Sequence, residues 1–194
     1  VCSSDLFSNI ILILGLFGTF IPTAFLASGV LRDAEFKTEE LFFSSPVRER
    51  DYLLGRFCGA FVVTALAFAS VPFAILVGSA MPWINPDTLG PVNPGHYVYL
   101  YLVLGVSNLF ITGIILFTVA NLTRSTIATY TALVTLLILY FVGNLALTDP
   151  SLRETIALVD PFGLNTYFEM TRYWTPFELN ERAVPLEGLL LKNR

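Results

Sequence analysis

The stretch RDAEFKTEELFFSSPVRERDYLLGRF, residues 32–57, decides how this chain is organised. It holds five basic and six acidic residues, and long uncharged runs lie on both sides of it. Four runs contain no Asp, Glu, Lys, Arg or His, and they cover residues 7–31, 57–81, 97–123 and 125–148. A helix needs about 20 apolar residues to cross the hydrocarbon core of a membrane. We therefore predict an all-α integral membrane protein with four transmembrane helices.

The composition supports this prediction. Of the 194 residues, 55% are hydrophobic and 13% are charged, whereas soluble domains carry roughly 25% charged residues. The net charge of −4 carries little information because the charges are segregated, and no basic face suited to nucleic acid is apparent. The two cysteines, Cys2 and Cys58, do not form a disulfide framework.

The charged stretch itself is predicted to form two helical pieces. Ser45 followed by Pro46 is typical of an N-cap with proline at the first helical position. The second piece should continue directly into the second span, where Pro72 predicts a kink because proline removes one backbone hydrogen bond. The resulting short surface helix ahead of a long rigid one could transmit a push from a soluble partner.

Basic residues near the span ends predict the orientation. Residues 32–56 carry five Lys and Arg, the Pro-rich loop 82–96 carries none, and Arg124 lies in a tight turn between the last two spans. The positive-inside rule therefore places residues 32–56 and Arg124 in the cytoplasm of a multi-pass protein of the plasma (inner) membrane, with the loop outside.

The chain divides into three regions. Residues 1–6 resemble a translated sequencing adapter and are expected to be non-native, residues 7–148 form the membrane region, and residues 149–194 form an external amphipathic tail. In this tail we expect helices at 152–159 and 165–174, a stop at Asp160-Pro161, and a capping box from Thr175 to Glu178. We interpret the chain as a fragment of a longer product, with a further helix after the tail.

Sequence motifs for catalysis are missing. The chain has no G-x-x-x-x-G-K-[ST], H-E-x-x-H or G-x-S-x-G pattern, and its single histidine, His96, cannot build a zinc site alone. We therefore expect no enzyme active site, metal or cofactor in this chain. Proton- or ion-coupled carriers usually place ionisable residues inside their spans, so the uncharged spans favour a channel-like or ATP-driven permease.

The charged stretch resembles the cytoplasmic segment between the second and third helices of ABC-2-type transporter permeases. The resemblance rests on Thr38-Glu39-Glu40-Leu41, Ser44-Ser45-Pro46-Val47, Arg50 and Tyr52-Leu53-Leu54-Gly55-Arg56, although Lys is common in the family where Arg56 stands. The tail is similar to a branch of large permeases sometimes fused to a zinc aminopeptidase domain, through Pro161-Phe162-Gly163, Thr171-Arg172-Tyr173-Trp174-Thr175, Asn180 and Asn193-Arg194.

This resemblance implies part of a six-helix permease half. It implies a coupling helix within residues 32–56, a second permease half, and a separate ATP-binding cassette ATPase that carries ATP and Mg. The expected contacts with that ATPase are Glu35, Phe36, Glu39, Glu40 and Leu41, with Pro46 and Arg50 fixing the angle of the following helix. The function implied is export of a substrate driven by ATP hydrolysis on the partner chain.

Other interpretations stay open. The charged stretch could be a solvated loop that only follows the positive-inside rule, or a regulatory loop of a channel or secondary carrier. The chain could also be the membrane anchor of a fused peptidase. Asn108, Asn121 and Asn144 are interpreted as ordinary interhelical hydrogen bonders rather than substrate contacts.

Overall fold

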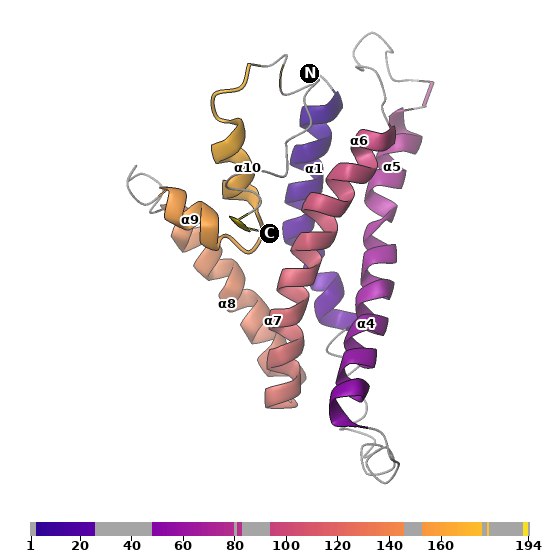
Figure 1. Ribbon diagram of the computed structural model, residues 1–194, viewed down its shortest axis with the longest axis vertical. Coiled ribbons are helices and arrows are strands. Elements are labelled where there is room, and N and C mark those ends of the chain that lie inside the picture. Colours follow the sequence, from indigo (N-terminus) through magenta and orange to yellow (C-terminus); the bar gives the residue numbers. More distant parts are fainter. Residues whose placement is uncertain are drawn as a thin grey trace. The chain divides into compact units, whose positions relative to one another are not determined.

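All regular elements that can be described are helices. The computed structural model describes residues 3–25, 48–79, 81–82, 94–145, 153–175, 178 and 192–193. In chain order (Figure 1) the elements are α1 Ser3–Gly18, α4 Glu49–Phe68, α5 Ser70–Ser79, α6 Pro94–Leu100, the π-helix η2 Tyr101–Val106, α7 Ser107–Thr123, α8 Thr126–Leu145, α9 Arg153–Val159 and α10 Leu164–Thr171.

Three helical stretches are long and apolar enough to cross a membrane. They are Arg50–Ser79, Tyr97–Thr123 and Thr126–Asn144, with 30, 27 and 19 residues, and they match the second, third and fourth predicted spans. The first predicted span appears as a shorter apolar helix, Asn9–Phe25, while residues 26–31 lie outside the described residues. Length and apolarity thus indicate a membrane protein with three helices long enough to cross a membrane, and the prediction of four spans is not confirmed.

Side chains on these helices suit a hydrocarbon environment. Large apolar side chains such as Leu66, Phe73 and Ile127 are exposed on the helix surfaces. The hydroxyl groups of Thr118, Thr131 and Thr135 each donate to the carbonyl four residues earlier in their own helix, at 2.8 Å in every case. These three hydroxyl groups are therefore satisfied by their own helix backbone, as a membrane environment requires.

Two prolines interrupt the helices in the same way. Pro72 has no N–H for the carbonyl of Phe68, and α4 ends at Phe68 before α5 resumes at Ser70. The second span is therefore interrupted just before the proline at which a kink was predicted. Pro22 stands four residues after Gly18, where α1 ends, and residues 20–25 are again helical. This second interruption was not predicted.

The end of the Pro-rich loop differs from the prediction. Residues 82–96 were expected to form a loop, but α6 begins at Pro94 and includes Gly95. Proline is favoured at the first helical position, where its missing N–H has no intrahelical acceptor. The helix of the third span thus begins three residues earlier than predicted. Helix α1 likewise begins at Ser3 rather than at residue 7.

The chain groups into two compact units. Unit 1 comprises Val1–Phe17, Phe68–Asn108 and Tyr140–Arg194, and unit 2 comprises Gly18–Ala67 and Leu109–Leu139. In unit 1, a Cβ added to Gly15 of α1 would lie 2.9 Å from Nδ2 of Asn108, so these two segments are in close contact. In unit 2, aromatic side chains of α4 pack against those of α7.

The tail follows the predicted pattern closely. Helices α9 and α10 match the predicted 152–159 and 165–174 helices, and the chain leaves α9 at Asp160-Pro161. Oε2 of Glu178 accepts hydrogen bonds from the backbone N–H and the hydroxyl of Thr175, both at 2.9 Å. Thr175 Oγ1 in turn accepts from the N–H of Glu178 at 3.4 Å, which completes the predicted capping box.

Candidate functional site

The charged stretch is described only in its second half. Residues 26–47 lie outside the described residues, and with them six of the seven predicted coupling residues, Glu35, Phe36, Glu39, Glu40, Leu41 and Pro46. The seventh, Arg50, lies in the first turn of α4 and is exposed. Within the described residues, the candidate site consists of the start of α4 and the residues that hold it in place.

Helix α4 joins the charged stretch to the second span without interruption. The carbonyl of Arg48 accepts the N–H of Asp51 at 3.0 Å and that of Tyr52 at 3.1 Å, which forms the first turn. The helix then continues to Phe68, well inside the apolar run. The prediction that the second helical piece runs on into the span is confirmed for the part from Glu49 onward.

Arg56 and Tyr52 form a contact one helical turn apart. Nε of Arg56 donates to the hydroxyl oxygen of Tyr52 at 3.3 Å, and the guanidinium carbon lies 5.5 Å from the centre of the Tyr52 ring. Because Tyr52 precedes Arg56, this contact holds the charge toward the polar beginning of the helix. The methylene groups of Arg56 can then lie along apolar surface while its charge stays near water.

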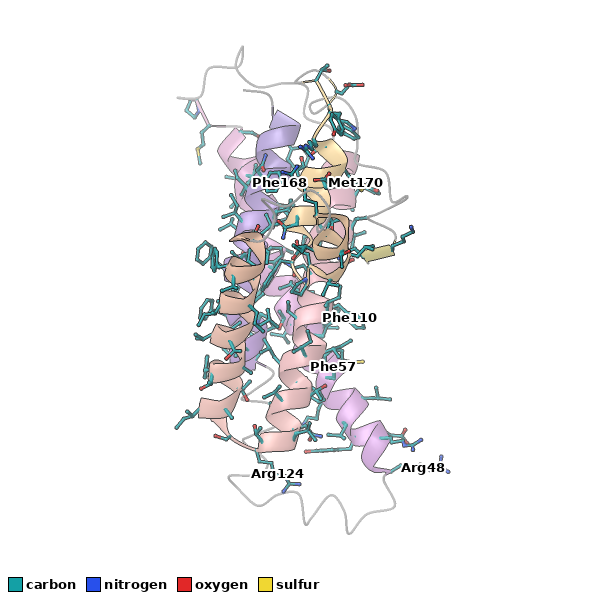
Figure 2. All side chains as sticks on the ribbon, turned by 90° about the vertical axis from the view of Figure 1, so that its left-hand side faces the viewer. Arg48, Phe57, Phe110, Arg124, Phe168 and Met170 are labelled. Atoms are coloured by element: carbon teal, nitrogen blue, oxygen red, sulfur yellow. The ribbon has the colours of Figure 1, made fainter. Side chains whose placement is uncertain are left out.

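Four phenylalanines connect α4 to α7 in unit 2. The Phe57 ring lies 5.9 Å from that of Phe61 in the same helix, and 5.9 and 5.2 Å from those of Phe110 and Phe117 in α7. Phe61 also contacts Phe110 at 5.4 Å, and the pairs between helices are edge-to-face. Figure 2 shows Phe57 and Phe110 close together. We call these four residues the aromatic cluster.

The α7–α8 link carries a second basic residue at the same end of unit 2. Arg124 has φ 49°, its N–H donates to the carbonyl of Ala120 at 2.9 Å, and α8 begins at Thr126. The predicted tight turn is therefore confirmed. Arg124 is exposed, and Figure 2 shows Arg124 and Arg48 toward the same end. This clustering of basic residues is what the positive-inside rule predicts for one membrane face.

The asparagines predicted to bond between helices behave differently from one another. Asn144 Nδ2 donates to the carbonyl of Tyr140 at 2.8 Å, within its own helix. Asn108 is 1% exposed and its Nδ2 packs closely on Gly15 of α1. The prediction of an interhelical role is therefore wrong for the Asn144 amide, whose bond stays local, whereas Asn108 does lie against another helix.

A polar network in the tail was missed by the sequence analysis. The Asp160 side chain is 4% exposed, and its two carboxylate oxygens accept the backbone N–H groups of Phe162 at 2.9 Å and Asn165 at 2.7 Å. It thereby satisfies donors at the start of α10, where a negative charge is also favourable. Gly163, with φ 70°, allows the chain to turn between them. The signal available in the sequence was Asp160-Pro161 followed by glycine, which we interpreted only as a helix stop.

Asn193 supplies the hydrogen-bond donor for the backbone carbonyls of this network. Its Nδ2 donates to the carbonyls of Ala157, Leu158 and Asp160 at 3.1, 3.0 and 2.9 Å, across more than thirty residues of sequence. These carbonyls lie at the C-terminal end of α9, where backbone acceptors need partners from outside the helix. The Thr166 hydroxyl also donates to the Ala157 carbonyl, at 2.5 Å. The network therefore ties α9, α10 and the end of the chain together.

Neither a metal-binding group among the described residues nor a known relative assigns a function to this chain. Across the described ranges, no group of three or more His, Cys, Asp and Glu side chains is placed to hold a metal ion. Comparison with family models, curated proteins and solved structures finds no match to this chain.

Proposed function

We propose that this chain is a membrane-spanning permease subunit of an ATP-driven exporter of the ABC-2 type. Its coupling segment, residues 32–56, would receive the movement of a separate ATP-binding cassette ATPase, and a second permease half would complete the pathway. The observation that carries this proposal is the continuity of α4, because one helix joins the charged segment to the apolar span. The sequence resemblance supplies the family.

The mechanical argument rests on the aromatic cluster. A displacement applied to the start of α4 moves that helix as a rigid rod, because its backbone hydrogen bonds run unbroken from Glu49 to Phe68. The three edge-to-face ring contacts with Phe110 and Phe117 then carry the displacement to α7. Packed side chains of this kind are one physical route by which coupling can travel.

The uncharged spans support an external source of energy. Residues 57–79, 97–123 and 126–144 contain no Asp, Glu, Lys, Arg or His. Ionisable residues within spans are the usual mark of proton relays and ion pathways. A transporter built on these helices would therefore take its driving force from a partner. In the proposed topology residues 7–31 form a fourth span, and residues 32–56 and Arg124 face the cytoplasm.

The test is reversal of charge at the predicted coupling helix. The Glu39→Lys/Glu40→Lys double variant of the full-length protein should insert normally but lose co-purification with an ATP-binding cassette ATPase and lose ATP-dependent transport. The matched control is Glu181→Lys/Glu187→Lys, which makes the same charge change in the predicted external tail and should retain both.

The alternatives give different results in the same experiment. A channel or secondary carrier with a regulatory loop would transport without a co-purifying ATPase, and a peptidase anchor would show no ATP-dependent transport at all. Unchanged ATPase association and transport in the Glu39/Glu40 variant would remove the proposed coupling role.

A further inference from the structure

The third span contains a wide helical turn. Residues Tyr101–Val106 form a π-helix between α6 and α7, so one run of backbone changes from the α to the π pattern and back. The hydroxyl of Ser107 donates to the carbonyl of Leu102, five residues earlier, at 3.2 Å. Single π turns inside α-helices are rare and frequently occur at functional sites.

The wide turn packs against the interruption in the second span, within unit 1. Phe68 is the last residue of α4, is 1% exposed, and its ring stacks on Tyr101 with 6.3 Å between ring centres. A Cβ added to Gly105 would lie only 2.9 Å from Cε1 of Phe68. The glycine therefore makes room for the ring, and the ring holds Tyr101 in the wide turn. Pro72 has no N–H, so the Phe68 carbonyl lacks its usual helical donor. The second and third spans are therefore both irregular where Phe68 meets Tyr101.

Conversion of this turn to an α-helix has a defined geometric result. A π turn holds one more residue than an α turn, so its loss shifts the preceding helix by one residue, which is a rotation of about 100°. Val98 would then take the place of Tyr97, and Tyr99 the place of Val98. Tyr97 is now 5% exposed, Val98 is 58% exposed and Tyr99 is half-buried, so the shift would bury Val98 and expose Tyr99.

We propose that the third span is a two-register switch, in which α6 turns by one residue relative to α7 when the Tyr101–Val106 segment passes between π and α patterns. The Phe68 ring, seated between Tyr101 and Gly105, stabilises the π register. Displacement of that ring releases the α register. This inference concerns the helix itself and does not depend on the proposed transport role.

Cysteine labelling distinguishes the two registers. In a full-length protein with its native cysteines, Cys58 among them, replaced by serine, a maleimide should label Val98→Cys rapidly and Tyr99→Cys slowly in nanodiscs. Adding Gly105→Ala displaces the Phe68 ring and should reverse the ratio of the two rates, with a change of about tenfold or more, as expected from overpacking a filled site. Gly78→Ala, whose added Cβ meets nothing within 4 Å, is the matched control and should change nothing.

A second variant covers the case in which Gly105→Ala disturbs folding. Phe68→Leu keeps an apolar side chain but removes the ring stack, and it should shift the labelling ratio in the same direction, whereas Phe73→Leu on the exposed surface should not. The switch is overturned if both Gly105→Ala and Phe68→Leu retain the original ratio. It is equally overturned if both positions become labelled together, because that result means loss of packing without a change of register.

Discussion

Replacing Phe57 by alanine removes the centre of the aromatic cluster. The Phe57 ring contacts Phe61, Phe110 and Phe117 at 5.9, 5.9 and 5.2 Å, and two of these contacts join α4 to α7. If the cluster is what holds these helices together, the variant should lose stability well beyond that of an ordinary phenylalanine substitution on the same span.

The expected magnitude follows from the ring contacts alone. Lipid tails are as apolar as the protein, so removing an apolar side chain in a membrane carries little of the hydrophobic cost familiar in water. What remains is the pairing of the rings, at about 0.5–1.5 kcal/mol for each aromatic pair. Three pairs therefore give an expected loss on the order of 2–4 kcal/mol in the free energy of unfolding.

The assay is unfolding in mixed micelles by titration with SDS, followed by circular dichroism. Phe73→Ala is the control, because Phe73 is 68% exposed on α5 and its loss should cost less than about 0.5 kcal/mol. Phe57→Leu should fall between the two, since it keeps apolar bulk without ring geometry. Equal losses for Phe57→Ala and Phe73→Ala would refute the assignment of the cluster as the link between α4 and α7.

Three further changes test the remaining contacts by the same measurement. Asp160→Ala removes the acceptor of two buried N–H groups and should destabilise the tail by about 2–4 kcal/mol; a loss under about 0.5 kcal/mol would contradict its capping role. Asn193→Ala should cost less, about 0.5–1.5 kcal/mol, and should raise hydrogen exchange in α9 without affecting α8. Gly15→Ala places a methyl group 2.9 Å from the buried Asn108 amide and should cost about 1–3 kcal/mol, whereas Gly78→Ala, with open space around it, should be neutral or slightly stabilising.

The elements that depend on local chemistry were predictable from the sequence. Uncharged runs identified three long helices, Pro72 identified the interruption between α4 and α5, and the Thr175–Glu178 capping box formed with both reciprocal bonds. Each of these features depends on the residue type itself and not on distant partners. Examples are the missing N–H of proline and the short oxygen-bearing side chain of threonine.

The features that were missed depend on partners far away in the chain. In a span that is apolar on every face, the hydrophobic pattern cannot reveal a π turn, and the one in the third span packs against Phe68 from another helix. Asp160 looked like part of a helix stop, yet its role depends on Gly163 turning with φ 70° and on Asn193 arriving from the end of the chain. For the candidate site, the sequence correctly predicted that residues 49–56 continue into the second span as one helix. The coupling helix itself stays a prediction.

The tight link at Arg124 has a consequence for the bilayer. The link joins two helical stretches of unequal length, Tyr97–Thr123 with 27 residues and Thr126–Asn144 with 19 residues. Both stretches therefore have one end at the link. At 1.5 Å per residue the first is roughly 40 Å long and the second roughly 28 Å, against a hydrocarbon thickness of about 30 Å. In a bilayer of this thickness the shorter helix would fit upright, whereas the longer one would have to tilt or reach beyond the hydrocarbon. A change of bilayer thickness should therefore change the tilt of the longer helix more than that of the shorter one. A change of lipid chain length should accordingly alter the angle between the two helices.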